Sequence, residues 1–151
     1  MEFIEVKTEK DCEIADSLLT ELIKFESDID KVINKNFIVK DFYSKIINKH
    51  TNMFCVYAQE DNQVLGYIYA YLKNPIGSVT FTNIICLDAL YVKEEYRKQG
   101  IGKKLMGQLE IWANKNYEKY EIEVTAINDN SNAMKFYESM GYKAIRTTFR
   151  K

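Results

Sequence analysis

The sequence is short of proline, cysteine and histidine, and each shortage argues against a class of protein. One proline in 151 residues leaves no proline-rich linker that would divide the chain. The three cysteines, Cys12, Cys55 and Cys86, are far apart and form no Cys-x-x-Cys pair, which argues against a disulfide framework and against a zinc or other metal site. The single histidine, His50, stands in a polar stretch, and we assign it no chemical role.

The chain also lacks an excess of charge of either sign. With a net charge of −1, no overall basic field favours nucleic acid or an anionic membrane as a partner. Eleven tyrosines and eight phenylalanines could stack on bases, but they are spread through periodic segments, which indicates a core. No signal peptide or long apolar span is seen, so the cytoplasm is the expected compartment. We expect residues 1–151 to form one domain.

Hydrophobic periodicity predicts an α/β protein with a mixed sheet. Helices are expected from Thr8 to Phe25, over about 39–48, from Gly100 to about 116, and over 132–140, with a polar break at 26–36. Phe42, Ile46 and Ile47 should face inward from the second helix. The expected strands are 3–6, 53–59, 64–72, a long strand over 79–92 with a bend at Thr82 and Asn83, 120–126 and 142–149.

The segment around Gly100 predicts an anion site. The apolar run 84–92 is followed by a charged loop, and Gly100-Ile101-Gly102 then opens an amphipathic helix. The first amides of a helix have no internal acceptor, and the helix dipole favours negative charge there. Glycine lets a phosphate approach the backbone closely. The basic residues around this helix start are Arg97, Lys98, Lys103 and Lys104.

Two common phosphate-binding motifs do not fit this segment. The dinucleotide motif requires a third glycine where Leu105 stands, and seven residues separate Gly100 from the strand. The nucleotide P-loop requires a Gly-Lys-Ser/Thr ending that is absent. The spacing Arg97-x-x-Gly100-x-Gly102 instead resembles the Q/R-x-x-G-x-G/A motif of the GNAT N-acetyltransferase family.

A second segment carries the same resemblance. Asn130-x-x-Ala133-x-x-x-Tyr137-x-x-x-Gly141-Tyr142 resembles the family's N-x-x-A-x-x-x-Y-x-x-x-G-F/Y segment. The two motifs stand in the family's order, one strand apart, and the resemblance covers about residues 84–142. It implies a single-domain acyl-CoA N-acyltransferase fold. Such a fold has a mostly antiparallel sheet with one splayed parallel strand pair and about four flanking helices.

The resemblance also implies that the chain binds acetyl-CoA, with no metal. The pantetheine arm would lie along the backbone of the strand that ends at Val92, and a backbone N–H of Leu90 or Val92 would polarise the thioester. The pyrophosphate would lie on the amides of 97–103. The residues that the resemblance assigns to this co-substrate are Leu90, Tyr91, Val92, Arg97, Lys98, Gln99, Gly100, Ile101, Gly102, Lys103, Asn130, Ala133, Phe136 and Tyr137.

Three residues are candidates for catalysis. Tyr137 would protonate the leaving thiolate, unless it is only a half-buried core tyrosine. Some family members keep a glutamate where this chain has Cys86, a weak hydrogen-bonding group. Asp88 shares that face of the strand and would deprotonate the amine, unless it makes only a structural hydrogen bond. Glu123 resembles a strand glutamate of other members, or it is a solvated residue of an alternating strand.

The family resemblance predicts direct transfer of an acetyl group to a primary amine. The amine could belong to a small molecule, a polyamine, an aminoglycoside or a peptide. The acidic residues of the first two helices and their connection would form a wall for a cationic amine, or they are solvated helix faces; they are Glu21, Glu26, Asp28, Asp30 and Asp41. The alternative function is a non-catalytic acyl-CoA-binding module. Since few residues follow the second motif, a homodimer could complete the acceptor side.

Overall fold

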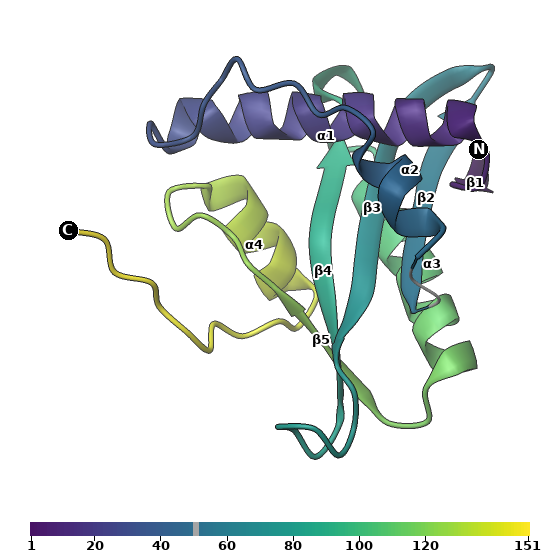
Figure 1. Cartoon of the computed structure of the whole chain (residues 1–151). Coiled ribbons are helices and arrows are strands. Elements are labelled where there is room, and N and C mark those ends of the chain that lie inside the picture. The colour runs from purple at the N-terminus through teal and green to yellow at the C-terminus, as the bar shows by residue number, and fades with distance from the viewer. Residues whose placement is uncertain (50–51) are drawn as a thin grey trace.

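The computed structural model describes residues 1–49 and 52–151 (Figure 1). His50 therefore lies outside the described residues. The strands in these ranges are β1 (Glu2–Glu5), β2 (Met53–Glu60), β3 (Gln63–Asn74), β4 (Asn83–Val92) and β5 (Tyr120–Val124). The helices in the same ranges are α1 (Glu9–Ile29), α2 (Phe42–Ile47), a short 3-10 helix η1 (Glu94–Tyr96), α3 (Ile101–Asn116) and α4 (Ser131–Ser139).

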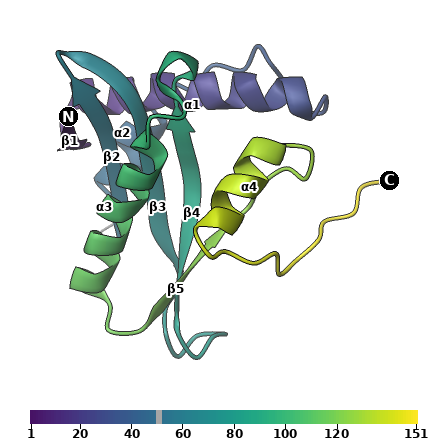
Figure 2. The same cartoon turned by 180° about the vertical axis from the view of Figure 1, so that it is seen from behind.

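The strands form one five-stranded sheet in the order β1-β2-β3-β4-β5. Neighbours from β1 to β4 are antiparallel, whereas β4 and β5 are parallel and joined through α3. Helices α1 and α2 cover one face of the sheet and α3 covers the other, as Figures 1 and 2 show from opposite sides. The predicted mixed sheet with one parallel pair and four flanking α-helices is confirmed for the described residues.

Helix α3 packs on the sheet through a stripe repeating every three or four residues. Ile101, Leu105, Met106, Leu109 and Ala113 are all buried against strands β2 to β4. Burial of each large apolar side chain contributes about 1.5–3 kcal/mol to the hydrophobic driving force. This packing fixes the start of α3 relative to the end of β4, and so fixes the loop between them.

On the other face, α1 holds α2 through hydrogen bonds as well as apolar contacts. The side chain of Thr8 caps α1 together with Asp11. Asp16 of α1 is buried, and its carboxylate accepts a hydrogen bond of 3.1 Å from the backbone N–H of Tyr43 in α2. The Tyr43 ring is 0% exposed and donates its hydroxyl proton to Tyr67 at 3.1 Å. Cys55 packs in this core as a small apolar residue.

Two predicted helix boundaries are wrong. Helix α1 extends into the predicted polar break at 26–36 and ends at Ile29. It extends this far because Phe25 and its neighbours contact β4 and the loop that follows it. Helix α2 covers only six residues, shorter than the predicted 39–48. Its buried residue is Tyr43, while Phe42, predicted to face inward, is 37% exposed. Ile46 and Ile47 do pack against the core.

The long strand predicted over 79–92 begins only at Asn83. Valine, threonine and phenylalanine favour strands, but a strand also needs a sheet to pack on. The tip of the β3–β4 hairpin extends beyond the core, and Phe81 is 94% exposed there. The Asn83 side chain accepts a hydrogen bond from the Ile76 N–H and donates one to the Lys119 carbonyl, both at 2.8 Å. These bonds close the hairpin tip and tie it to the start of β5.

The predicted last strand, 142–149, is also wrong. Alternating residues predicted a strand, but residues 142–151 form no ladder with β5 or with another described segment. The chain runs past α4 toward the end of α1 (Figure 1), where the Arg150 guanidinium bonds both carboxylate oxygens of Asp30 at 3.0 Å. Phe149 is 91% exposed. An alternating pattern alone does not supply a pairing partner.

Within the described residues, none of the helices combines the length and hydropathy needed to cross a membrane.

Candidate active site

A bulge in β4 sets the direction of its side chains. In the pairing of β3 with β4, Tyr69 lies opposite Ala89 and Ala70 opposite Leu87, so Asp88 is the extra residue. The bulge changes which face the alternating side chains point to. Leu87 and Leu90 therefore both belong to the α3 side, while Asp88 turns toward the α1 and α2 side. A carboxylate stands in the middle of an apolar strand because the bulge places it there.

Beyond Leu87, β4 and β5 separate. Their pairing ends with Leu87 opposite Val124, while β4 continues for five more residues to Val92. A cavity of about 210 Å³ fills the gap, bounded by both strands, α1 and α4. The predicted splay of a parallel strand pair is present. The residues that line this cavity are Leu22, Phe25, Glu26, Leu87, Asp88, Leu90, Tyr91, Val92, Arg97, Gly102, Val124, Thr125, Ala126, Ile127, Asn130, Asn132, Ala133, Phe136 and Tyr137.

The cavity between β4 and β5 brings together most of the residues predicted for the co-substrate. The predicted residues that line it are Leu90, Tyr91, Val92, Arg97, Gly102, Asn130, Ala133, Phe136 and Tyr137, together with the candidate base Asp88. Lys98, Gln99, Gly100, Ile101 and Lys103 lie in the adjoining loop and first turn of α3 but not in the cavity lining. The Ile101 side chain is 3% exposed and belongs to the core, so only its backbone is available to a ligand.

The loop between β4 and α3 presents the start of a helix to this cavity. Lys98 and Gly100 both adopt left-handed backbone conformations, with φ of 61° and 79°, which turn the chain sharply into α3. The first N–H groups of α3 have no acceptor within the helix. Gly102 lies against α4, where an added Cβ would stand 3.3 Å from two ring atoms of Phe136. Glycine here lets the helix start approach α4 closely.

Arg97 is held by the protein itself. Its Nε donates a hydrogen bond of 2.8 Å to the carbonyl oxygen of Val92. Its guanidinium lies 4.5 Å from the ring centre of Phe25 and 5.6 Å from that of Tyr91. Such cation–π contacts add to the anchoring of the group. Arg97 therefore fastens the end of β4 to α1 and keeps its positive charge at the cavity.

Tyr137 lines the same cavity from α4. Burial, the neighbouring Tyr142 ring and the charge of Glu26 all raise the pKa of its hydroxyl. The phenol therefore keeps its proton at neutral pH and is available as a donor. The Tyr142 ring packs on it at 5.7 Å between centroids, directly after the helix end at Gly141, where φ is 88°.

Glu26 also lines this cavity, although the sequence analysis considered it only as part of a general acidic wall. It lies in the last turns of α1, where Leu22, Phe25 and Glu26 follow the i, i+3, i+4 spacing of one helical face and all line the cavity. Burial and the charge of Asp88 raise the pKa of Glu26. A search of the sequence for residues on the same helical face as Leu22 and Phe25 would have identified Glu26.

Asp88 has the same tendency to hold a proton. Its side chain remains open to solvent within the cavities, but the surrounding apolar walls reduce the hydration of its carboxylate, and this desolvation raises its pKa. The structure shows no hydrogen bond from a described residue to this carboxylate. A structural hydrogen bond within the described chain therefore does not account for Asp88.

Two predicted residues are engaged in other contacts. Glu123, on β5, lies outside the cavity lining and forms ion pairs with Arg146 at 3.3 Å and Lys73 at 3.9 Å. Asn130 is in the lining but also caps α4, where its Oδ1 accepts a hydrogen bond of 3.2 Å from the N–H of Ala133. Its amide nitrogen is left for a ligand.

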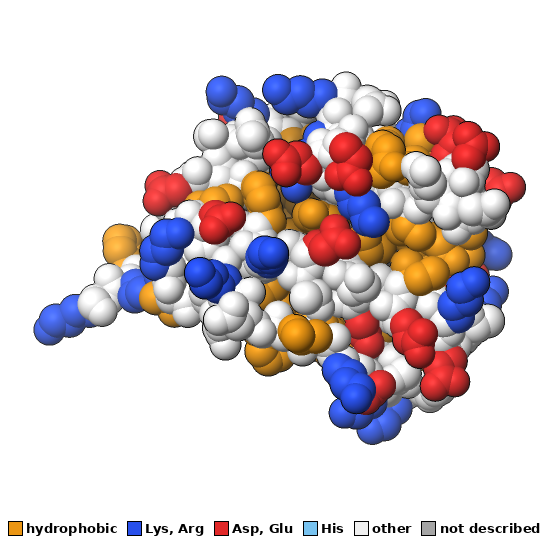
Figure 3. Space-filling view, turned by 90° about the horizontal axis from the view of Figure 1, so that it is seen from above, with side chains coloured by type: hydrophobic (Ala, Val, Ile, Leu, Met, Phe, Trp, Pro, Cys, Tyr) orange, Lys and Arg blue, Asp and Glu red, His pale blue; other side chains and the backbone are white. Residues whose placement is uncertain are grey.

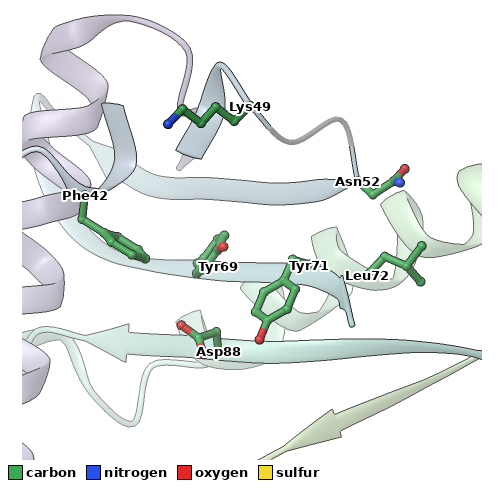
Figure 4. A pocket seen from close by; sticks show the side chains of 7 residues that line it. All are labelled: Phe42, Lys49, Asn52, Tyr69, Tyr71, Leu72 and Asp88. Carbon is green, nitrogen blue, oxygen red and sulfur yellow. The ribbon is translucent and has the colours of Figure 1, made fainter. Parts of the chain in front are cut away.

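A second cavity, of about 600 Å³, opens on the α2 side of the sheet. Figure 4 shows the side chains that line it: Phe42, Lys49, Asn52, Tyr69, Tyr71, Leu72 and Asp88. Asp88 lines both cavities. One carboxylate thus faces the gap between the splayed strands and also an aromatic chamber on the other side.

Residues 17–142 match the model of the acetyltransferase (GNAT) family. Two curated relatives are named as acetyltransferases. The catalytic subunit of the N-terminal acetyltransferase B complex of Arabidopsis thaliana is 31% identical over 72% of this chain, which spans 60% of that protein. An N-alpha-acetyltransferase of Sulfurisphaera tokodaii is 28% identical over 97% of this chain and 89% of its own length.

Solved structures share the fold. Protein BH1408 of Bacillus halodurans, solved as a tetramutant, has a TM-score of 0.84 at 17% identity and covers 100% of this chain and 99% of its own. The aminoglycoside N-acetyltransferase AAC(6')-Iy, solved with a CoA bisubstrate analogue, has a TM-score of 0.73 at 16% identity and covers 99% and 96%. With the family model matching most of its length, the chain belongs to the GNAT family of acetyltransferases.

Proposed function

We propose that this GNAT acetyltransferase binds acetyl-CoA in the gap between β4 and β5 and transfers the acetyl group directly to a primary amine. Both substrates would be bound together, so no covalent enzyme intermediate is required. The observation that carries the proposal is the position of Asp88, which lines both the gap and the chamber beyond it. A carboxylate shared by two cavities stands where an amine and a thioester would meet.

The gap suits the long, partly polar arm of the co-substrate. Beyond Leu87, β4 has no strand partner on its β5 side within the described residues, so backbone groups there are free to bond an extended ligand. The first amides of α3, together with Arg97, Lys98 and Lys103, would hold the pyrophosphate. The amide nitrogen of Asn130 would bond the pantetheine arm. Ala133 and Phe136 would pack against the arm.

The amine must lose a proton before it attacks, since an alkylammonium has a pKa near 10.4. Asp88 would accept that proton, directly or through a water molecule. The freed nitrogen lone pair then attacks the thioester carbonyl carbon, and the carbonyl oxygen gains negative charge. A backbone N–H of Leu90 or Val92 would stabilise this oxyanion.

The intermediate collapses by breaking the carbon–sulfur bond, and the attacking nitrogen releases its remaining excess proton to solvent to give the neutral amide. Tyr137 would donate its proton to the departing CoA thiolate and recover one from solvent. The raised pKa of Tyr137 makes it a weaker acid than a free tyrosine but ensures that the proton is present. Glu123, the other predicted base, would need to leave its ion pairs with Arg146 and Lys73 to take part.

The amine acceptor could be a small-molecule amine, a polyamine, an aminoglycoside or a peptide amine. The curated relatives are named as the catalytic subunit of an N-terminal acetyltransferase complex and as an N-alpha-acetyltransferase, and AAC(6')-Iy is named as an aminoglycoside N-acetyltransferase. The greater sequence identity of the first group favours the α-amine of a peptide. We take this amine, rather than a sugar amine, as the first acceptor to test.

We also propose a homodimer. In this chain β5 is an edge strand and residues 142–151 add no strand beside it. A second copy would cover that edge and the exposed side chains of Ile145 and Phe149. Light scattering at working concentration checks this: a mass of twice 17.7 kDa supports the dimer, and a monomeric mass contradicts it.

One experiment separates the enzyme from a non-catalytic binding module. Thermal unfolding is first followed with acetyl-CoA, CoA and NADH, because a ligand at about 100 times its Kd adds about 2.7 kcal/mol of stability. Free thiol is then measured with acetyl-CoA and a panel of peptides and small amines. The enzyme releases thiol only when an amine is present, and Tyr137→Phe slows it. A module is stabilised by CoA but releases no thiol with any amine.

A further inference from the structure

Three aromatic side chains line the second cavity, the chamber on the α2 side. Phe42 from α2 and Tyr69 from β3 meet edge to face at 6.3 Å between ring centroids. Tyr69 and Tyr71 then stack at 5.9 Å with 30° between their planes. These three rings form a continuous aromatic wall, and Asp88 lies on the neighbouring strand beside Tyr69 and Tyr71 (Figure 4). Phe42 is partly exposed to the chamber, so its ring is available to a ligand.

Charge is distributed unequally along this wall. Asp88 stands on β4, whereas Lys49 lies just after α2, and Figure 4 shows the aromatic side chains between the two. Lys49 forms no ion pair with an acidic side chain in the described part of the chain. The chamber is therefore negative at the end near the reacting centre and positive at its rim.

The acidic wall that would favour a polycation is absent from both cavities as the structure describes them. Of the five acidic residues considered for this wall, only Glu26 lines a cavity, and it lines the cavity between β4 and β5. Glu21 pairs with Lys93 at 3.9 Å and Asp30 with Arg150 at 3.0 Å. Over the face that carries α1, acidic and basic side chains are mixed (Figure 3). None of these acidic residues therefore lines the chamber on the α2 side, where a second ammonium group would lie.

We infer that the aromatic chamber selects primary amines that carry one positive charge and a flat or extended apolar group, and that Lys49 rejects amines with a second positive charge at the far end. This deepens the proposed function and rests on it. The reacting ammonium lies at Asp88, and the apolar group of the amine packs on Phe42, Tyr69 and Tyr71. The far end of the amine then lies at the rim of the chamber, beside Lys49. A peptide N-terminus with an apolar first residue fits this description, and a polyamine does not.

A matched pair of amines tests the charge rule. Hexylamine and 1,6-diaminohexane share the same chain and differ only in the second ammonium. Because the diamine offers two equivalent amines, equal recognition would give it twice the kcat/KM of hexylamine. We expect the wild-type chain to prefer hexylamine by about tenfold, the factor that corresponds to about 1.4 kcal/mol of charge repulsion.

Lys49→Glu is the decisive variant. Placing a carboxylate at the rim should remove or reverse the preference, so that the diamine becomes the better substrate. Lys45→Glu is the matched control, since Lys45 is exposed on α2, four residues before Lys49, but does not line the chamber. It makes the same change in net charge, and it should leave the ratio of the two amines unchanged.

A second pair tests the aromatic wall. Phenethylamine and ethylamine differ by a flat apolar ring, and the wild-type chain should favour phenethylamine through a lower KM. Phe42→Ala should reduce that advantage by about tenfold, because the ligand ring then loses an aromatic contact in addition to buried apolar area. Phe42→Leu keeps the bulk of the side chain and should retain part of the advantage. The KM for acetyl-CoA should stay constant in both variants.

Binding measurements separate the failure of this inference from the failure of the proposed function. Calorimetric titration of each amine into the CoA-bound protein reports recognition without turnover. If no amine is acetylated but hexylamine binds and Lys49→Glu shifts binding toward the diamine, the inference holds and the catalytic proposal fails. Equal use or binding of both amines by the wild type, or a ratio that Lys49→Glu and Lys45→Glu change alike, overturns the inference.

Discussion

The carboxyl group of Asp88, on β4, lies near that of Glu26, on α1, and burial together with the charge of Asp88 raises the pKa of Glu26. Desolvation raises the pKa of Asp88 in the same cavity. Two neighbouring carboxyl groups with raised pKa values titrate as a coupled pair, and the first to ionise makes the second harder to ionise. The charge of Asp88 thus favours the protonated form of Glu26, so Asp88 is the carboxyl group that ionises first and can accept a proton.

The pH dependence of the rate follows from this arrangement. Asp88 must be ionised to accept a proton, so kcat/KM should rise with pH through an acidic limb that lies above the usual aspartate range near 3.9. Asp88→Asn should remove this limb and lower kcat by about 10²–10⁴-fold. The KM for acetyl-CoA should change little. Rates of thiol release measured from pH 4 to pH 9 check both effects.

Glu26→Gln is the control for the coupling. It removes the neighbouring carboxyl group without removing the base. Because desolvation raises the pKa of Asp88, whereas the charge of Asp88 raises that of Glu26, the acidic limb should stay near its wild-type position. The maximal rate should remain within a few fold of wild type. A loss of rate in Glu26→Gln as large as that in Asp88→Asn would instead identify Glu26 as the base.

Tyr137→Phe tests the proton donor. The substitution removes one oxygen while keeping the ring that packs against Phe136 and Tyr142, so the melting temperature should change little. We expect kcat to fall by about 10²-fold or more, because the thiolate must then leave without a proton. The stabilisation by CoA in thermal unfolding should persist. An unchanged kcat would leave Tyr137 as a packing residue only.

The parts of the site that sequence reasoning identified are those fixed by local backbone chemistry. Gly100 and Gly102 mark the helix start because a left-handed turn and a close approach to Phe136 require glycine. The spacing of Asn130, Ala133 and Tyr137 places them on one part of α4 beside the gap. These positions depend on residues near one another in the chain, and so a short motif carries the information.

The parts that were missed depend on contacts between distant segments. Glu26 joins the site only because α1 crosses the end of β4, and the aromatic chamber needs Phe42, Tyr69 and Asp88 from three separate elements. The residue at which β4 bulges, Asp88, is set by the pairing of β4 with β3 and leaves no mark in β4 alone. Residues 142–149 alternate like a strand, yet pairing also needs a neighbouring edge that their path does not follow.

Gly102→Ala tests the close approach of α3 to α4. The added methyl group would meet the Phe136 ring at 3.3 Å, so the ring must shift by a few tenths of an ångström, and the helix start would move relative to the gap. We expect weaker binding of CoA by about tenfold. Gly107→Ala is the control: its Cβ would meet nothing within 4 Å, and alanine in a helix interior should stabilise the fold by about 1 kcal/mol. Calorimetry of CoA binding compares the two, and equal affinities would mean that Gly102 serves only the packing of α3 against α4.

Asp16→Ala tests whether α1 positions the aromatic chamber. The buried carboxylate of Asp16 accepts the N–H of Tyr43, the residue after Phe42, and its loss would leave that N–H without an acceptor. An unsatisfied buried group costs about 1–3 kcal/mol, which urea unfolding would detect. Because α2 carries Phe42, KM for phenethylamine should also rise while KM for acetyl-CoA stays constant. Asp16→Asn keeps an acceptor oxygen and should restore most of both properties. If the alanine variant loses stability but keeps the wild-type KM for the amine, Asp16 supports the core alone and α2 is positioned by its apolar contacts.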